Sequence, residues 1–530
     1  YQDSSITLEP DSALPPEMVP VAGGLLGVQA PGFGDVPPLR LQDFLMDRFE
    51  VTNRDYKRFV DAGGYRRRDL WPEPIVKDGR TLGWEQAVAL MTDRTGRTGP
   101  ATWEGGEFPA GRGQDPVGGV SWYEAMAYAK FGGKSLPTVF HWDRAASPWN
   151  SAWIIPASNF SGERARPVGS APDMSAFGTY DMAGNVREWC LNASGSQRFI
   201  LGGGWGDPPY RFNDIYAQAP FDRSPLNGIR LVRYPAGDTN VARAAAPLTR
   251  TLRDFDRVQP VSDAVFAAYR QMYAYDRTPL DPRVLETLDE ADWTRELVRV
   301  NAAYGGDTLL LYLYLPKRGA RPFPTVVYFP PGNAIFNPSV TLAASHNFDF
   351  LLHSGRAVLL PVYKGTFQRR DGLTSDTPDS SIAWRDHVVM WAKDLGRGID
   401  YLETRPDVTT ARLAYYGISF GAAEAPMMLA VERRITVSVL LVAGLEFTRM
   451  RPEVDPVNYL PRIQIPTLML NGRYDFYFPI ETSQKPMFRL LGTPSDQKRY
   501  VIEDGSHFVP RDKLIRETLD WLDRYQPVGK

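Results

Sequence analysis

The second half of the chain alternates continuous apolar runs with segments that have helical spacing. Apolar runs occupy residues 323–329 and 356–362, a third begins at Leu413, and between them the segment 382–403 repeats apolar residues along one helix face. Strands that are apolar throughout are buried on both faces, and helices between them favour parallel neighbours. We therefore predict an α/β domain over residues 261–530 with a mainly parallel sheet.

Flanking patterns extend this domain in both directions. Apolar residues recur at helical spacing over 261–275 and 514–521, which predicts an entering and a closing helix. Two consecutive strand patterns at 293–301 and 308–316 predict an antiparallel hairpin that leads into the sheet.

The first half has a different pattern of residues. From Val21 to Tyr234 there are few periodic runs and many Gly, Pro, Trp and Asn residues, which favours irregular backbone held by aromatic packing. Two short helices are nevertheless predicted. Thr52 has the position of an N-cap, and Ser121 is followed three residues later by Glu124, the spacing of a capping box.

These patterns divide the chain. Residues 1–20 are polar and predict an extended lead-in, residues 15–235 form an irregular α+β domain, and 236–260 are poor in apolar residues and predict a linker. A chain of 530 residues suits two or three cores of ordinary size.

Composition narrows the possible partners. A net charge of −2 without any basic run gives no electrostatic case for nucleic acid or an anionic membrane surface. No apolar stretch is long enough to cross a bilayer. The single cysteine, Cys190, excludes an internal disulfide framework and a multi-cysteine metal site. The oligomeric state stays open.

The first residue bears on location. Because the chain starts at Tyr1 rather than Met, we expect a preceding signal or anchor to have been removed. We therefore expect an extracytoplasmic bacterial protein, secreted or periplasmic.

A strand, a sharp turn and a helix are predicted around Gly417-Ile-Ser-Phe-Gly421. In such a turn the central serine takes a strained backbone conformation, and the two glycines let strand and helix approach without Cβ clashes. The hydroxyl of Ser419 would project above the end of a strand. Because this pentapeptide also arises by chance, its context must decide.

A serine nucleophile needs an imidazole to take its proton and a carboxylate to orient that imidazole. The buried-strand pattern of 466–475 ends in Asp475 after a glycine turn, and 499–507 ends in His507 in the same way. The order Ser, Asp, His is that of strand–turn–helix nucleophiles. We predict a triad of Ser419, Asp475 and His507. Taken singly, Asp475 as a turn former or His507 as a loop residue is the alternative.

Six segments in the first half follow one another in a fixed order. They are Phe49-Glu-Val-Thr-Asn-Arg-Asp-Tyr56, Pro116-Val-Gly-Gly-Val-Ser-Trp-Tyr-Glu-Ala125, Gly133-Lys-Ser-Leu-Pro-Thr138, Tyr180-Asp-Met-Ala-Gly-Asn-Val-Arg-Glu-Trp189, Leu201-Gly-Gly-Gly-Trp205 and Gly228-Ile-Arg-Leu231. Together they resemble the formylglycine-generating-enzyme (sulfatase-modifying factor) family. The resemblance implies an irregular, C-type-lectin-like α+β fold.

The resemblance also implies what this domain lacks. Family members that oxidise a sulfatase cysteine bind copper through two late cysteines, and no cysteine follows Gly204 here. Cys190 has no partner, so we predict no formylglycine-generating activity. Related sulfoxide synthases use a histidine cluster, whereas His141 is the only histidine before the predicted linker.

In the family a calcium ion sits at a Gly-Asn-x-x-Glu motif. Here the motif falls on Gly184, Asn185, Val186 and Glu188, whose oxygens suit calcium. The alternative is that Asn185 shapes a turn and Glu188 forms a salt bridge. The family's second site would use Asn159, but its acidic partner is missing.

The second half resembles the α/β-hydrolase superfamily, in particular its dienelactone-hydrolase and prolyl-oligopeptidase-like branch with carboxylesterases. The resemblance covers 261–530 and rests on Ser419, Asp475 and His507. The combination of both halves also resembles the C-terminal portion of certain bacterial membrane-anchored serine/threonine kinases, although no kinase motif is present.

The hydrolase resemblance implies an oxyanion hole. One donor would be the backbone N–H of Phe420, and the other would lie in the loop after the strand that ends at residue 329. Pro330 and Pro331 have no N–H, so Asn333 is the expected second donor.

Our prediction is a serine carboxylesterase that works through an acyl-enzyme without a catalytic cofactor, with the first domain as scaffold or binding module. Its expected partner is a small-molecule or polymeric ester. Aromatic residues at 476–478 could line the pocket, and no acidic pair is evident that would hold a peptide N-terminus. The alternatives are an aminopeptidase or amidase of the same branch, and a ligand-binding protein with a degenerate hydrolase domain.

Overall fold

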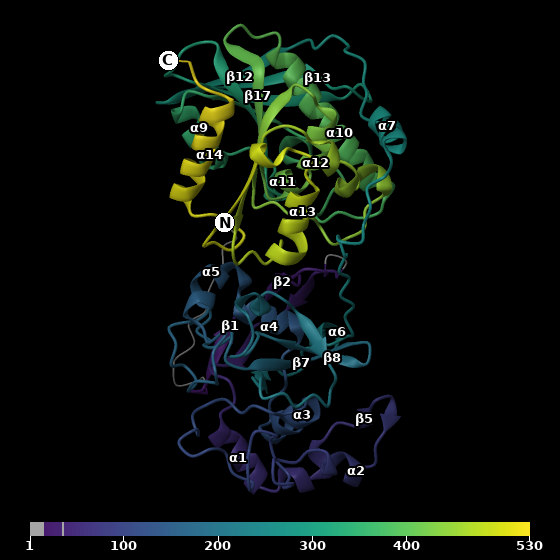
Figure 1. Cartoon of the computed structure of the whole chain (residues 1–530), viewed down its shortest axis with the longest axis vertical. Coiled ribbons are helices and arrows are strands. Elements are labelled where there is room, and N and C mark those ends of the chain that lie inside the picture. Colours follow the sequence, from purple (N-terminus) through teal and green to yellow (C-terminus); the bar gives the residue numbers. More distant parts are fainter. Residues whose placement is uncertain (1–14, 34–35, 530) are drawn as a thin grey trace. The chain divides into compact units, whose positions relative to one another are not determined.

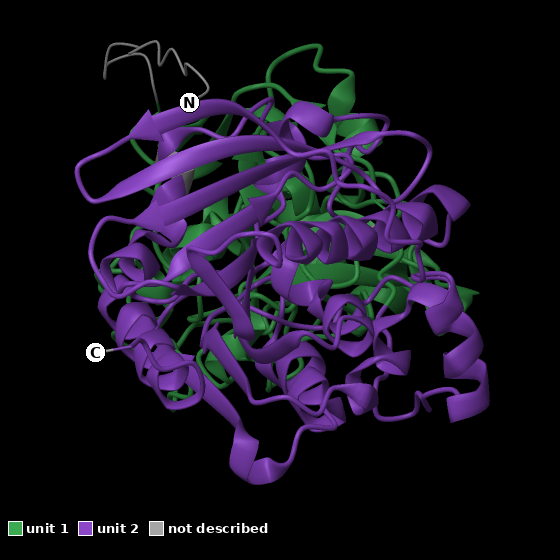
Figure 2. Ribbon diagram, turned by 90° about the horizontal axis from the view of Figure 1, so that it is seen from above, with its two compact units in different colours: residues 1–251 green, residues 252–530 purple. Residues whose placement is uncertain are grey.

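The computed structural model describes residues 15–33 and 36–529. The chain divides into two compact units between Thr251 and Leu252, within the segment predicted to be a linker (Figures 1 and 2). Residues 1–14 of the predicted lead-in lie outside the described residues. The end of that lead-in is wrong, because a strand begins at Met18. Within the predicted linker, residues 240–244 form a short helix, α6 (Asn240–Ala244).

The second unit is built on one nine-stranded sheet (Figure 1). In spatial order its strands are β12 (Arg283–Asp289), β13 (Trp293–Asn301), β14 (Thr308–Pro316), β16 (Ala357–Pro361), β15 (Phe323–Phe329), β17 (Val408–Ile418), β18 (Ile435–Leu441), β19 (Thr467–Gly472) and β20 (Lys498–Glu503). All neighbours from β16 to β20 are parallel, and β12 to β16 are antiparallel. The mainly parallel sheet of the α/β-hydrolase fold is confirmed.

Helices cover both faces of this sheet. They are α7 (Asp263–Gln271), α8 (Asn333–Phe336), α9 (Asp349–His353), α10 (Ile382–Leu402), α11 (Phe420–Ala423), α12 (Ala425–Val431), α13 (Lys485–Leu490) and α14 (Arg511–Tyr525). In Figure 1, α9 and α14 lie on one side of β17, and α10 and α12 on the other. The predicted entering, central and closing helices correspond to α7, α10 and α14.

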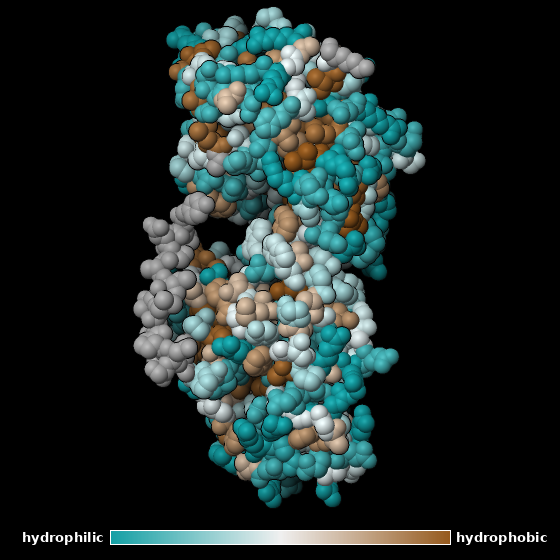
Figure 3. Space-filling model, turned by 90° about the vertical axis from the view of Figure 1, so that its left-hand side faces the viewer, coloured by the Kyte–Doolittle hydropathy of each residue, from teal (hydrophilic) through white to brown (hydrophobic). Residues whose placement is uncertain are grey.

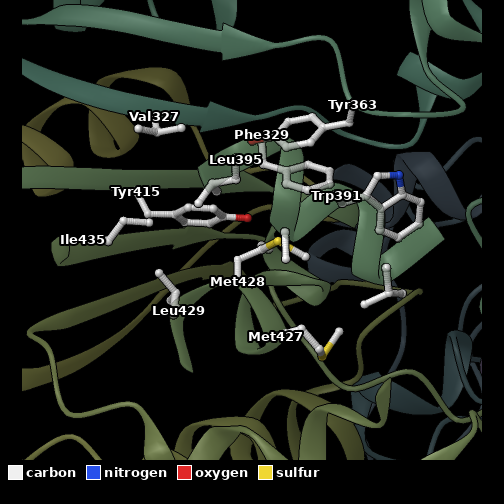
Figure 4. Packing of buried hydrophobic residues seen from close by; sticks show 14 of the residues in the cluster. Val327, Phe329, Tyr363, Trp391, Leu395, Tyr415, Met427, Met428, Leu429 and Ile435 are labelled. Carbon is white, nitrogen blue, oxygen red and sulfur yellow. The ribbon is translucent and has the colours of Figure 1, made fainter. Parts of the chain in front are cut away.

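Side chains of one strand divide between two cores. On β15, Val327 and Phe329 join the core under α10, whereas Val326 and Tyr328 join the core under α14. Figure 4 shows the first core, where the ring of Phe329 stacks on Tyr363 with centroids 3.9 Å apart. Apolar residues at consecutive positions are therefore needed because both faces are covered, as the sequence pattern predicts.

Two strands of this sheet, β12 and β18, were not predicted. β18 is apolar and almost entirely buried, so its sequence could have marked it as a strand. β12 lies at the edge of the sheet, pairs only with β13, and is exposed over most of its length. An edge strand with two solvated faces has no apolar pattern by which it could be recognised.

The first unit contains several small sheets. Its strands are β1 (Met18–Val21), β4 (Phe44–Asp47) and β11 (Val232–Arg233) in one sheet, β10 (Asn227–Gly228), β7 (Arg187–Ser194), β8 (Gln197–Leu201) and β9 (Tyr216–Gln218) in a second, and the pairs β2 (Gly24–Leu26) with β3 (Leu39–Leu41) and β5 (Val76–Lys77) with β6 (Arg80–Thr81). Its longer helices are α1 (Asn53–Asp61), α2 (Trp84–Ala89), α3 (Trp122–Phe131) and α4 (Val139–Ala146), and a single turn forms α5 (Ser151–Ile154).

Both predicted helix caps of this unit are present. The Thr52 side chain accepts a hydrogen bond from the backbone N–H of Asp55 at the start of α1. At the start of α3, Ser121 and Glu124 form the reciprocal capping box. Aromatic rings hold the irregular backbone, and Tyr56 on α1 stacks on Tyr128 of α3 with centroids 5.2 Å apart.

A buried ion pair lies at the centre of this unit. The guanidinium of Arg230 donates to the carboxylate of Glu188 at 2.7 Å, and both side chains are inaccessible to solvent. Arg230 also donates to the backbone carbonyl oxygens of Asp47 and Tyr180. One guanidinium therefore ties β4, β7 and the segment before the Gly-Asn motif together.

Polar residues cover most of the face drawn in Figure 3, with apolar patches scattered among them. Within residues 15–33 and 36–529, no helix has the length and apolar character needed to cross a bilayer.

Replacing Arg230 with Met tests the buried pair. Because the variant leaves the Glu188 carboxylate buried without its counter-charge, we expect the free energy of unfolding to fall by about 3–5 kcal/mol. Urea denaturation measures the change. In the control Arg68→Met, which breaks an exposed pair with Glu73, the loss should stay below about 1 kcal/mol. Equal losses in the two variants would refute the assignment.

Candidate active site

The nucleophile turn lies where β17 ends and α11 begins. Between them, Ser419 has φ 52° and ψ −112°, a region that residues with a Cβ rarely adopt. Its backbone N–H donates to the carbonyl oxygen of Leu441 at the end of β18. The strained residue is therefore fixed by the neighbouring strand.

The two glycines of the turn are required by close contacts. A Cβ on Gly417 would lie 2.5 Å from the carbonyl oxygen of Gly421, so strand and helix could not approach. A Cβ on Gly421 would lie 2.3 Å from the carbonyl oxygen of Phe329 at the end of β15. The turn thus sits directly against a second strand end.

The structure brings the three predicted residues together. The Ser419 hydroxyl lies 2.7 Å from Nε2 of His507, and Nδ1 of His507 lies 3.1 and 3.0 Å from the two carboxylate oxygens of Asp475. Asp475 follows β19 and His507 follows β20. All three distances are in hydrogen-bond range. The arrangement can pass a proton from the hydroxyl to the imidazole while the carboxylate orients the ring.

The acid is held in place by its own loop. The Oδ1 atom of Asp475 accepts hydrogen bonds from the backbone N–H groups of Tyr477 and Phe478 at 2.9 and 3.0 Å. These bonds hold the carboxyl group in one orientation toward His507. The same loop brings aromatic rings to the imidazole, and the ring of Tyr477 lies edge-on to His507 with centroids 4.7 Å apart.

The predicted oxyanion donors lie beside the turn. Because Gly421 abuts Phe329, the loop after β15 starts next to the nucleophile, and Asn333 begins α8 in that loop. Among the described residues, neither the backbone N–H of Phe420 nor that of Asn333 has a hydrogen-bond acceptor. Both donors are therefore available for a substrate oxygen.

Sequence reasoning missed three carboxyl groups near the triad. Glu424 directly follows α11, Glu446 lies in the loop after β18, and Asp376 lies in the loop before α10. The Asp376 carboxyl group lies against the loop after β15, since a Cβ on Gly332 would be 1.8 Å from its Oδ2. Glu424 between alanines and Glu446 between Leu and Phe could have been noticed as isolated charges in apolar sequence.

Burial dominates the chemistry of these groups. It raises the pKa of Glu424 to about 8, with the charge of Glu446 as a further cause. The pKa of Glu446 is also raised to about 8 by burial and then by the charges of Asp376 and Asp475. Burial raises the pKa of Asp376, which the nearby imidazole of His507 opposes. The three groups are thus electrostatically connected to the triad.

Comparison with known proteins identifies the first half. Residues 5–235 match the model of the sulfatase-modifying factor enzyme 1-like domain. The formylglycine-generating enzyme of Thermomonospora curvata is 32% identical over an alignment of 224 residues, and the match covers 33% of this chain and 71% of that enzyme. The chain belongs to the sulfatase-modifying factor family. The resemblance drawn from the six ordered segments is confirmed.

A second relative is longer than the match. The hercynine oxygenase of Mycolicibacterium thermoresistibile is 29% identical over an alignment of 270 residues, and the match covers 47% of this chain and 53% of that enzyme. The chain therefore spans about half of that enzyme's length.

For the second half, the matching solved structures have low sequence identity and low TM-scores. Acetyl xylan esterase 1 from Thermoanaerobacterium sp. matches with 14% identity and a TM-score of 0.41, covering 51% of this chain and 96% of that chain. The glucuronoyl esterase from Solibacter usitatus matches with 16% identity and a TM-score of 0.37, covering 51% of this chain and 95% of that chain.

In the sulfatase-modifying-factor domain, the residues implied for calcium do not fit a cation. The Asn185 side-chain oxygen accepts from the backbone N–H of Arg166 and from Asn159, and the Val186 N–H donates to Glu50. These groups already have protein partners.

The acidic member of the motif is also engaged. One Glu188 oxygen accepts from Arg230 and the other accepts from the indole N–H of Trp142 at 2.6 Å. The side-chain oxygens of Asn185 and Glu188 are thus occupied by protein donors, as the salt-bridge alternative predicts, and Val186 itself donates its backbone N–H to Glu50. Across the described residues no group of three His, Cys, Asp or Glu side chains could hold a metal ion.

Cys190 is buried in β7 of this domain. Burial raises the pKa of its thiol well above the ordinary value. A thiol without thiolate character is a poor metal ligand and nucleophile.

Changing Gly421 to Ala tests the nucleophile turn. Because the added Cβ meets the Phe329 carbonyl, we expect a loss of about 1–3 kcal/mol in unfolding free energy, measured by urea denaturation. Gly372→Ala is the matched control, since a Cβ there meets nothing within 4 Å. A Gly421→Ala protein as stable as the control would show that the turn is not tightly packed.

Calcium should not stabilise the first domain. With the Asn185 and Glu188 oxygens engaged by protein donors, we expect the same Tm in excess EDTA and in millimolar calcium, measured by differential scanning calorimetry. A calcium-dependent rise in Tm would contradict this reading of the motif.

Proposed function

We propose that the chain is a serine hydrolase that cleaves carboxylic esters through an acyl-enzyme. The observation that carries the proposal is the unbroken hydrogen-bond series from the Ser419 hydroxyl through His507 to Asp475. A serine in a strained strand-to-helix turn, with its base and acid on the next two strand ends, is typical of α/β-hydrolase nucleophiles.

The proposed cycle has two halves. Ser419 attacks the ester carbonyl while His507 takes the hydroxyl proton, and the same imidazole then protonates the departing alcohol as the C–O bond breaks. Water next enters, gives a proton to His507 and attacks the acyl carbon, and that proton returns to Ser419 as the acid leaves. Asp475 stabilises the imidazolium in both halves.

The negative carbonyl oxygen of each tetrahedral intermediate needs donors. The backbone N–H groups of Phe420 and Asn333 are the proposed pair, because both are at the turn and both lack a partner among the described residues. An oxyanion hole formed by two backbone groups requires no cofactor.

For the first domain we propose a scaffold or binding role. Its family's copper chemistry needs a cysteine pair, and this chain has Cys190 alone. A binding role for this domain is compatible with catalysis by the second unit.

Fluorophosphonate labelling tests the proposal. We expect a fluorophosphonate probe to label the wild-type chain, and Ser419→Ala to lose both the label and at least about 10³-fold in kcat/KM on p-nitrophenyl acetate. Ser495→Ala, at an exposed serine of the same unit, should keep both.

Three outcomes would contradict the proposal. Labelling or hydrolysis that survives in Ser419→Ala would place the nucleophile elsewhere. Absence of labelling in the wild-type chain would favour a binding protein with a degenerate hydrolase domain. Faster cleavage of aminoacyl amides than of esters would favour the peptidase or amidase alternative.

A further inference from the structure

The carboxyl groups of Asp376, Glu424 and Glu446 have no cationic side chain to balance them. The charges that act on them are one another's, that of Asp475 and that of the His507 imidazole. No lysine or arginine of the described residues takes part. Four carboxyl groups therefore share one titratable imidazole.

Glu424 is the most deeply buried of the three. It is 1% exposed, and within the described part of the chain its Oε2 has no hydrogen-bond partner. Other buried carboxyl groups of the described residues accept hydrogen bonds, as Asp394 does from Arg369 at 2.6 Å and Asp181 does from the Gly169 N–H at 2.6 Å. Leaving a buried carboxyl oxygen unsatisfied costs stability, and a bound ligand can offset that cost.

Asp376 stands where a negative charge would oppose the proposed reaction. Its carboxyl group contacts Gly332, the residue before the proposed oxyanion donor Asn333. A carboxylate at this position repels the oxyanion that forms on the substrate, unless a proton or a bound cation neutralises it. The site is thus arranged for a substrate that brings positive charge.

We propose that the hydrolase site takes substrates with an organic cation, such as a protonated amine, and that Asp376 and Glu446 bind it with Glu424 behind them. This inference rests on the proposed function and names the substrate class of the same site. Burial raises the pKa of all three carboxyl groups and so favours their neutral forms. A bound cation favours the charged forms and supplies the missing counter-charge.

The cation has two possible places in the substrate. A protonated amine beside the carbonyl would belong to the acyl part, as in an aminoacyl ester, whereas a quaternary ammonium would belong to the alcohol part, as in a choline ester. Both present a cation to the carboxyl groups of Asp376 and Glu446. Substrates paired with neutral isosteres show which part of the substrate carries the recognised charge.

The test compares each cationic substrate with its neutral isostere. Alanine p-nitrophenyl ester is paired with p-nitrophenyl isobutyrate, and acetylthiocholine with 3,3-dimethylbutyl thioacetate, with Ser419→Ala as the blank for spontaneous hydrolysis. We expect the cationic member of at least one pair to have a kcat/KM about 10-fold or more above its isostere. The pair that shows the preference identifies the part of the substrate that carries the charge.

Variants then assign the preference to these residues. In Glu446→Gln and in Asp376→Asn we expect the ratio of the two kcat/KM values to fall toward one, whatever happens to the overall rate. Asp371→Asn is the matched control, because it removes the same charge from the same loop but faces His387 at 3.0 Å. Its ratio should equal that of the wild-type chain.

The outcomes separate this inference from the proposed function. Equal hydrolysis of both members in each pair, lost in Ser419→Ala, would overturn the cationic substrate class and leave the esterase. A wild-type preference that persists in both Glu446→Gln and Asp376→Asn would also overturn the assignment. Failure to hydrolyse any of the four esters would overturn both.

Discussion

The backbone strain at Ser419 is the constraint on which the second unit depends. A residue with a Cβ is held at φ 52°, and it stays there because β18 holds its N–H and β15 closes against the turn through Gly421. Such a conformation persists only where the surrounding structure determines it. The parallel sheet fixes this conformation, because its central strands end at the same edge and contact the turn there. From that edge His507 reaches the hydroxyl, and Asp475 reaches His507.

The same edge collects more carboxyl groups than acyl transfer requires. Asp475 is oriented by two backbone N–H groups, whereas burial raises the pKa of Glu424 and Glu446 to about 8 and favours their neutral forms. In the first unit, by contrast, the buried carboxylate of Glu188 is neutralised by the guanidinium of Arg230. The Oε2 atom of Glu424 has neither a cation nor a hydrogen-bond donor among the described residues, and its place beside the nucleophile turn gives this difference a functional meaning.

The sheet and the triad could be predicted because each depends on local sequence. Apolar runs at 323–329 and 356–362 mark doubly covered strands, and a glycine turn after a strand marks Asp475 and His507. The carboxyl groups near the triad could not be predicted, because Asp376, Glu424 and Glu446 come from three distant segments that only the folded sheet brings together. β12 was not predicted for another reason. Both of its faces are solvated, so its sequence has no alternation of apolar and polar residues. At the motif implied for calcium, the positive charge beside Glu188 comes from Arg230, which lies far along the chain and could not be assigned to it from the sequence.

The central claim is that Ser419 becomes covalently acylated during turnover. The most direct measurement is mass spectrometry of peptides from enzyme quenched in acid while it hydrolyses p-nitrophenyl acetate. The account predicts an added acetyl group on the peptide that contains Ser419, and none on that peptide from Asp475→Asn at the same early time, because an unoriented imidazole slows the attack. Steady hydrolysis by the wild-type chain with acetyl on another residue, or with no acetylated peptide during a burst of nitrophenol release, would contradict it.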